Sequence, residues 1–207
     1  MKTIGLTGGI GMGKSAAAQW LQSSGIAVVD TDDLARAVVE PGQPALDEIK
    51  DAFGGGVIGS DGRLRRDELA RAVFPDAAAR KKLEAILHPR IHDLWSVQFD
   101  IWRAENKPLA VVIIPLLFET GAGKEFDAVV CVACSAVTQR DRLRLRGWTD
   151  DEIRSRIAAQ MPVTQKMERS NHVAWSEGDL EVLHRQLMRI IISIEPKQKT
   201  CMIGGQG

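Results

Sequence analysis

An eight-residue segment near the amino end of the chain has the residue types and spacing of a phosphate-binding loop. Residues 8–15 read Gly-Gly-Ile-Gly-Met-Gly-Lys-Ser and match the pattern G-x-x-x-x-G-K-[ST]. Glycines let the backbone adopt positive φ angles and bring successive N–H groups against phosphate oxygens. Lys14 can neutralise the outer phosphates, and Ser15 has a hydroxyl of the kind that enters an octahedral Mg²⁺ shell. The segment predicts a site for ATP or a similar nucleotide with Mg²⁺.

The elements that must position this loop are a strand before it and a helix after it. Residues 2–7 are typical of a short strand, and residues 15–24 of a helix that Gly25 can end. A helix beginning at the loop points its positive end at a bound anion. This context favours a nucleotide site over a glycine-rich turn without a ligand. The residues expected to contact the nucleotide here are Gly8, Gly9, Gly11, Met12, Gly13, Lys14, Ser15 and Ala16.

Two carboxylates, Asp30 and Asp32, follow a second predicted strand at residues 26–30. A parallel strand–helix–strand unit crosses over in a right-handed sense, so both strands end at one edge of the sheet and the carboxylates are expected near the loop. On an extended chain they share one side, so one can help to position Mg²⁺ and one can accept a proton from an attacking hydroxyl. We assign the base to Asp32. The alternative is structural, with Asp32 capping the next helix.

Four arginines alternate along residues 139–146. At about 100° per residue on a helix, Arg140 and Arg144 share one side, and Arg142 and Arg146 share the opposite one. One pair can close over a triphosphate as a lid and exclude water, while the other pair stays solvated. An ordinary charged surface helix is the alternative.

Two further residues are candidates for contacts at the site. Pro89 biases His88 out of helical geometry, so we expect His88 at the end of a helix, with a packing or capping role favoured over a ligand contact by spacing alone. Arg36 stands four residues past Asp32 and can reach the same site.

The remaining apolar segments predict an α/β fold with a doubly wound parallel sheet. Residues 109–114 and 128–133 are continuously rich in Val and Ile, which is typical of strands covered on both faces. Cys131 and Cys134 fall in or beside the latter, and we expect core thiols, because no second Cys pair accompanies them. The stretch between the second and third strands is too long for one crossover helix, so it predicts a helical insertion above the carboxyl ends of the strands.

Composition excludes several classes of partner. Lys plus Arg and Asp plus Glu are equal at 27 each in 207 residues, so no overall field favours a nucleic acid or an anionic membrane. No apolar run has the length of a membrane span, and no secretory signal pattern opens the chain, so we expect a cytoplasmic protein. As a separate expectation, the protein is a monomer or small homo-oligomer.

Taken together, these motifs resemble the dephospho-coenzyme A kinase family over about residues 3–190. The resemblance rests on residues 6–15, Asp-Thr-Asp with Ala35-Arg36, Val-Glu-Pro-Gly at 39–42, Leu83-Glu84, Leu87-His88-Pro89, Pro-Leu-Leu-Phe-Glu at 115–119, and Gln139 with Arg142 and Arg146.

The resemblance implies Mg²⁺-dependent transfer of the ATP γ-phosphate to the ribose 3′-hydroxyl of dephospho-CoA. It implies one three-layer domain of the P-loop type, with a core at about 1–35, 108–137 and 171–195, a helical substrate subdomain at 36–107, a helical lid at 138–170 and a tail at 196–207. It selects Arg142 and Arg146 as the lid pair that contacts ATP. Implied catalytic residues are Asp32, Lys14 and Arg142; implied metal ligands are Ser15 and Asp32; implied substrate contacts are Asp32, Arg36, His88, Pro89, Leu117 and Glu119.

Three residues depart from the family pattern. Ala16 replaces a usual threonine, Ser176 a usual asparagine, and Arg65 stands where an aspartate often precedes the arginine matched by Arg66.

Two other functions stay open: a kinase for another small alcohol or nucleotide, since loops build the acceptor pocket, and a nucleotide-dependent switch. The Asn-Lys-x-Asp pattern that reads guanine in such switches is absent, because Asn106-Lys107 continues as Pro-Leu.

Overall fold

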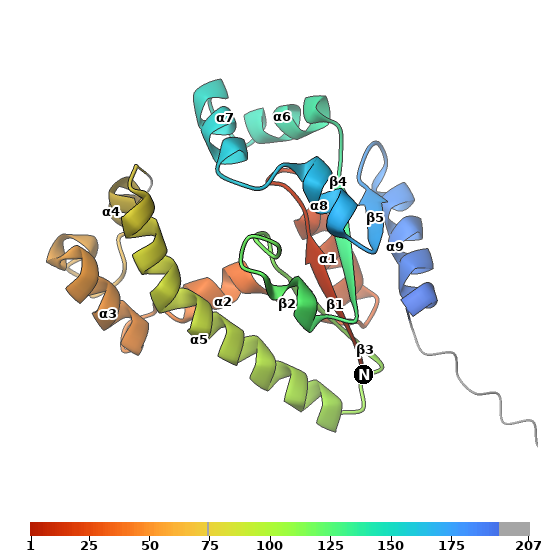
Figure 1. Cartoon of the computed structure of the whole chain (residues 1–207), viewed down its shortest axis with the longest axis horizontal. Helices are drawn as coiled ribbons and strands as arrows, with labels where there is room; N and C mark the ends of the chain where they lie inside the picture. Colours follow the sequence, from red (N-terminus) through yellow and green to blue (C-terminus); the bar gives the residue numbers. More distant parts are fainter. Residues whose placement is uncertain (74, 195–207) are drawn as a thin grey trace, which may run out of the picture.

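The structure is a computed structural model that describes residues 1–73 and 75–194. The tail expected at 196–207 lies outside the described residues. Figure 1 shows a central sheet with helices on both faces and two helical regions extending beyond it.

The sheet has five parallel strands in the order β2-β3-β1-β4-β5. The four predicted strands are present as β1 (Lys2–Thr7), β2 (Ala27–Asp30), β3 (Leu109–Ile113) and β4 (Ala128–Ala133). Every residue of β3 and β4 is buried, as their continuous apolar content predicts. The fifth strand, β5 (His172–Trp175), is a short edge strand that the sequence analysis did not identify. A doubly wound parallel sheet is confirmed.

Helices cover the two faces of the sheet and make it the middle of three layers. On one face, α1 (Lys14–Ser23) and α9 (Leu180–Ile194) pack against alternate residues of the strands, such as Leu6 and Val111. On the other face, the second half of α5 (Ala77–Ala104) packs Trp95 and Phe99 against Val112. Alternate strand residues point to opposite faces, so one sheet forms two cores.

The insertion between β2 and β3 is helical, as predicted, and has a core of its own. It contains α2 (Thr31–Ala37), α3 (Pro44–Phe53), a 3₁₀ turn η1 (Gly55–Val57), α4 (Arg66–Val73) and the first half of α5. Residues from α3, η1, α4 and α5 and from the turn after α2, including Val39, Ile49, Leu69 and Ile86, form one apolar cluster. The insertion therefore projects from the sheet as a compact unit, to the left in Figure 1.

The expected helix end at His88 is wrong, because α5 continues through Pro89. The Arg90 side chain donates to the Ile86 carbonyl at 2.6 Å and so satisfies a backbone acceptor in the turn that the proline disturbs. The first half of α5 is buried in the insertion and the second half against the sheet. Tertiary packing at both ends therefore overrides the local bias of the proline.

The second helical region follows β4; in Figure 1 its first two helices lie above the sheet and its last helix lies beside β4. It contains α6 (Ala136–Arg144), α7 (Asp150–Ala158) and α8 (Val163–Arg169). Another 3₁₀ turn, η2 (Ala122–Glu125), precedes β4. The expected single helix carrying all four arginines is wrong at its end, because α6 stops at Arg144 and Arg146 lies in the turn that follows. A capping box between Thr149 and Glu152 then begins α7.

The two cysteines near the end of β4 lie in the core. Cys131 and Cys134 are buried, with 0% and 3% of their surface exposed, as expected of core thiols, and burial raises the pKa of Cys131 to about 11. Within the described ranges, no helix combines the length and the apolar content needed to cross a membrane.

Candidate active site

The phosphate loop lies directly against the end of β4. Gly8 has a φ of 147°, and a Cβ atom built there would meet the Val132 carbonyl oxygen at 2.2 Å. Gly13 has a φ of 93° and precedes α1 without any side-chain cap. The first N–H groups of α1 thus have no side-chain acceptor and face the loop, an arrangement that favours a bound anion.

Lys14 folds over this loop. Its ammonium nitrogen donates to the carbonyl oxygens of Gly8 and Gly9 at 2.9 and 3.0 Å. The pKa of Lys14 is lowered to about 8, mainly by burial and also by repulsion from the Lys166 ammonium, while the carboxylates after β2 oppose the shift. The carboxylates therefore lie within electrostatic reach of the loop lysine, as the topology predicts.

Asp30 and Asp32 have different roles in the structure. Helix α2 begins at Thr31, whose hydroxyl donates to the Ile113 carbonyl at 2.9 Å and fixes the helix against β3. Asp30 is the N-cap and accepts a hydrogen bond from the Asp32 N–H at 2.9 Å. The extended Asp-Thr-Asp segment is therefore wrong, and Asp30 takes the capping role considered for Asp32. Burial raises the pKa of Asp30.

Two cavities meet the phosphate loop. The larger, of about 410 Å³, is lined by Ile10, Lys14 and Asp32, together with residues of α4, α5, α7 and the segment after β3. Arg80 and Glu84, four residues apart on α5, contribute to the same wall. The Asp32 carboxylate and the loop lysine, Lys14, thus lie beside one cavity that is large enough for part of a small-molecule substrate.

The smaller cavity, of about 270 Å³, is lined by the other side of the loop and the start of α1, including Gly13 and Ser15. Arg142 and Arg146 both line it, so the pair selected by the family resemblance does lie together. Arg142 donates to the hydroxyl and to the carbonyl of Ser176 at 2.9 and 2.5 Å. The Ser176 hydroxyl in turn donates to the carbonyl of loop residue Met12 at 2.8 Å. Ser176 therefore links Arg142 to the loop.

The remaining predicted contact residues lie in several places. Glu119 lines the larger cavity. Leu117 is in the core with 0% exposure, and its neighbour Leu116 lines the cavity instead. Arg36 forms an exposed ion pair with Asp33 at 3.0 Å.

His88 and Pro89 are on α5 but are not part of the lining of either cavity. Glu84, one turn earlier on the same helix, lines the larger cavity.

Several residues of the site were not found by the sequence analysis. Arg80 could have been found from its spacing of four residues to Glu84 on a helix. Arg156, Gln160 and Lys166 are brought to the site by tertiary packing, and no local pattern marks them. Among the described residues, no three His, Cys, Asp or Glu side chains form a metal-binding group, so any metal would need phosphate oxygens or hydroxyls as further ligands.

The fold and this site define a P-loop kinase: a parallel sheet, a phosphate loop between β1 and α1, an arginine pair over one side of the loop and a carboxylate on the other. The family model described as Dephospho-CoA kinase matches residues 2–181. The chain belongs to this family of ATP-dependent enzymes.

Individual relatives agree with this assignment. The Dephospho-CoA kinase of Bdellovibrio bacteriovorus is 40% identical over 195 residues, which cover 94% of this chain and 97% of that protein. The crystal structure of TT1252 from Thermus thermophilus superimposes with a TM-score of 0.82 at 36% identity, covering 94% and 98% of the two chains. A Dephospho-CoA kinase from Campylobacter jejuni has a TM-score of 0.63 at 19% identity over 94% and 97%, a likeness of fold alone.

The lowered pKa of Lys14 predicts a pH dependence of ATP binding. Phosphate attracts the charged ammonium, and the free enzyme loses that charge as the pH rises through about 8. Binding above this pH must therefore take up a proton. We expect the Kd for ATP, measured by calorimetry without Mg²⁺, to be steady from pH 7 to 7.5 and to rise towards about tenfold per pH unit above pH 8.

Lys14→Arg is the control, since a guanidinium keeps its charge throughout this range. Its Kd should change little with pH. A wild-type Kd that is equally flat up to pH 9.5 would contradict the role of Lys14 as the charged phosphate ligand.

Proposed function

We propose that this kinase transfers the γ-phosphate of ATP to the 3′-hydroxyl of the ribose of dephospho-CoA, releasing CoA and ADP. The observation that carries the proposal is the division of the loop between two cavities. Ser15 and the arginine pair border the smaller one, and Asp32 borders the larger one, with Lys14 also in its lining. The γ-phosphate of ATP and the hydroxyl that accepts it can thus meet at the end of the loop where Lys14 lies.

The smaller cavity supports the assignment of the nucleotide side. A triphosphate along the loop can accept from the first N–H groups of α1, while Arg142 and Arg146 add positive charge from above. Arg142 already has a fixed orientation through Ser176. Arg142 is therefore preorganised to neutralise charge that develops during transfer, which is the main source of acceleration in such reactions.

Asp32 is the proposed general base in the larger cavity. Its carboxylate accepts the proton of the acceptor hydroxyl as the oxygen bonds to the γ-phosphorus and the bond to the ADP oxygen breaks. Asp30 is less suited to this task, because its side chain caps α2. Lys14 balances the charge of the transferred group.

Mg²⁺ fits the donor set of the loop. The Ser15 hydroxyl is exposed at the start of α1, and Asp32 supplies a carboxylate, which together with phosphate oxygens and water matches the way Mg²⁺ is usually held. When bound, the ion neutralises phosphate charge and aligns the γ-phosphate.

We further propose that residues 36–107 form the substrate subdomain and residues 138–170 the lid. The larger cavity has α5 of the former on one wall and α7 of the latter on another, so an acceptor would contact both. Arg80 and Glu119 are then among the polar groups available to it. Arg36, His88 and Pro89 would reach it only after the helices close. Closure of this kind excludes water from the transfer.

The function is tested by following ATP turnover with dephospho-CoA, adenosine, shikimate and simple sugars as acceptors. We expect turnover with dephospho-CoA alone to be well above the water background, and mass spectrometry to show a product one phosphate heavier that carries it on the ribose 3′-oxygen. Preferred turnover of another alcohol would assign a different acceptor, and ATP hydrolysis without transfer would indicate a switch.

Asp32→Asn tests the general base. The amide is nearly the same size but cannot accept a proton, so we expect kcat to fall by about a hundredfold or more while both substrates still bind. Asp33→Asn, the next residue on α2, removes the same charge from an exposed ion pair and should keep kcat within about threefold. Asp32→Asn activity within a few fold of wild type would place the base elsewhere.

A further inference from the structure

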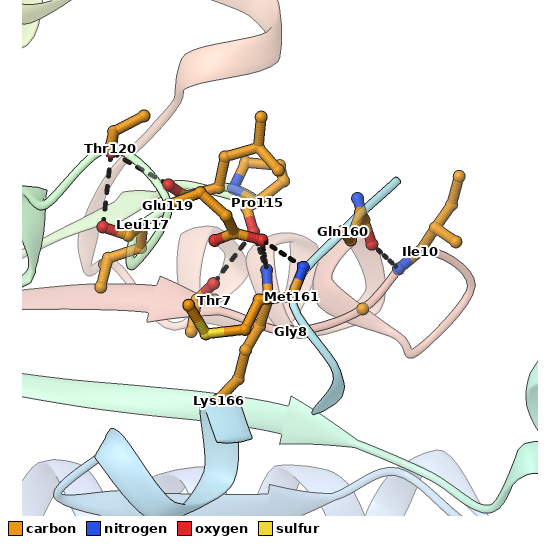
Figure 2. A network of polar contacts seen from close by, with 12 residues as sticks. Thr7, Gly8, Ile10, Pro115, Leu117, Glu119, Thr120, Gln160, Met161 and Lys166 are labelled. Carbon is orange, nitrogen blue, oxygen red and sulfur yellow. Dashed lines mark hydrogen bonds and ion pairs between the residues drawn. The ribbon is translucent and has the colours of Figure 1, made fainter. Parts of the chain in front are cut away.

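Lys166 is the only charged residue that is fully buried in the part of the chain that the structure describes, with 0% of its surface exposed. Its ammonium nitrogen donates to the Pro115 carbonyl at 2.6 Å and forms an ion pair with Glu119 at 2.8 Å (Figure 2). A buried ammonium is stable only when it is paired and hydrogen-bonded. The Pro115 carbonyl and the Glu119 carboxylate therefore fix the position of the ammonium, and the ammonium in turn fixes theirs.

The partners of Lys166 come from one segment after β3, and they contact two others. The Pro115 carbonyl also accepts from the Thr7 hydroxyl, at 3.2 Å, at the end of β1. The Glu119 carboxylate also accepts from the Met161 N–H at 2.8 Å. Met161 belongs to residues 159–162, which we call the α7–α8 connector. The Met161–Glu119 hydrogen bond thus joins this connector to the segment after β3, and the ion pair with Lys166 holds the Glu119 carboxylate that accepts it (Figure 2).

The connector also contacts the phosphate loop. The Gln160 side-chain oxygen accepts from the N–H of Ile10 at 3.0 Å. Gln160 and Ile10 both line the larger cavity. Arg156 and Ala159, which precede Gln160 in the sequence, line it as well. No connector residue lines the smaller cavity, whose lid residues come from α6 and the turn after it. A shift of the connector would therefore act directly on the larger cavity and would reach the smaller one only through the loop.

We propose that Lys166 is a positioning residue for the acceptor side of the reaction. Through Glu119 and the connector, its buried charge holds Gln160 and Arg156 at the wall of the larger cavity. The inference rests on the proposed function, because it takes that cavity as the acceptor site. Lys166 itself contacts no substrate.

The test compares Lys166→Met, which keeps an unbranched side chain one atom shorter and removes the charge, with Lys166→Arg, which keeps the charge. In Lys166→Met we expect the KM for dephospho-CoA to rise about tenfold or more, with the Kd for ATP, measured without acceptor, within about twofold of wild type. Lys166→Arg should restore the KM to within about threefold. Lys50→Met, an exposed lysine on α3, is the matched control and should change neither value.

Two results would overturn the inference: equal losses of affinity for both substrates, which indicate a general structural role, and an unchanged KM in folded Lys166→Met. If that variant does not fold, Lys166→Met combined with Glu119→Gln leaves no unpaired charge and replaces it. Because the two residues are proposed to act as a unit, the double variant should match the more impaired of the single variants that fold. A rise in KM in the double variant equal to the product of the rises in the two single variants would show that Lys166 and Glu119 act independently.

Amide hydrogen exchange separates this inference from the proposed function. In the enzyme without substrates, the N–H groups of Met161 and Ile10 should exchange about tenfold faster in Lys166→Met than in wild type, because the connector is no longer held. Unchanged exchange would refute the positioning role. Failure of the wild-type enzyme to phosphorylate dephospho-CoA would instead refute the proposed function, and the exchange result does not depend on the acceptor.

Discussion

The site depends on the close approach of the phosphate loop to the end of β4. A Cβ atom at Gly8 would lie 2.2 Å from the Val132 carbonyl oxygen, so only glycine allows the two backbones this distance. The contact sets where the loop leaves β1, and with it the start of α1 and the place of Lys14. Because β4 is an internal strand whose residues are all buried, the loop rests on the core of the sheet. Preorganised amides of this kind need no rearrangement when phosphate charge arrives.

The rest of the chain divides the surroundings of that loop into a nucleotide side and an acceptor side. Strand order places β3 and β4 on either side of β1, so segments after both strands reach the loop. The segment after β4 continues into α6 and supplies Arg142 to the smaller cavity. The segment after β3 supplies Glu119 to the larger one, where Lys166 pairs with it. The same topology that forms the sheet therefore separates the two substrates.

Local sequence patterns were sufficient for the core and for the charged groups nearest the loop. Apolar runs predicted four of five strands, and the glycine pattern with the rule of right-handed crossovers placed Asp32 near Lys14. Patterns failed where packing between distant segments decides the structure. Pro89 lies inside α5 because two apolar cores hold that helix. Lys166 resembles any surface lysine in the sequence, and its burial follows from the packing of α8 against β4 and the segment after β3.

The most direct test of the account is a crystal structure with a non-hydrolysable ATP analogue and dephospho-CoA bound together. The account predicts the triphosphate along the loop, the nucleotide base in the smaller cavity, and the ribose 3′-hydroxyl of dephospho-CoA about 3 Å from the Asp32 carboxylate, facing the γ-phosphate. A 3′-hydroxyl out of reach of Asp32, or dephospho-CoA bound in the smaller cavity, would contradict it.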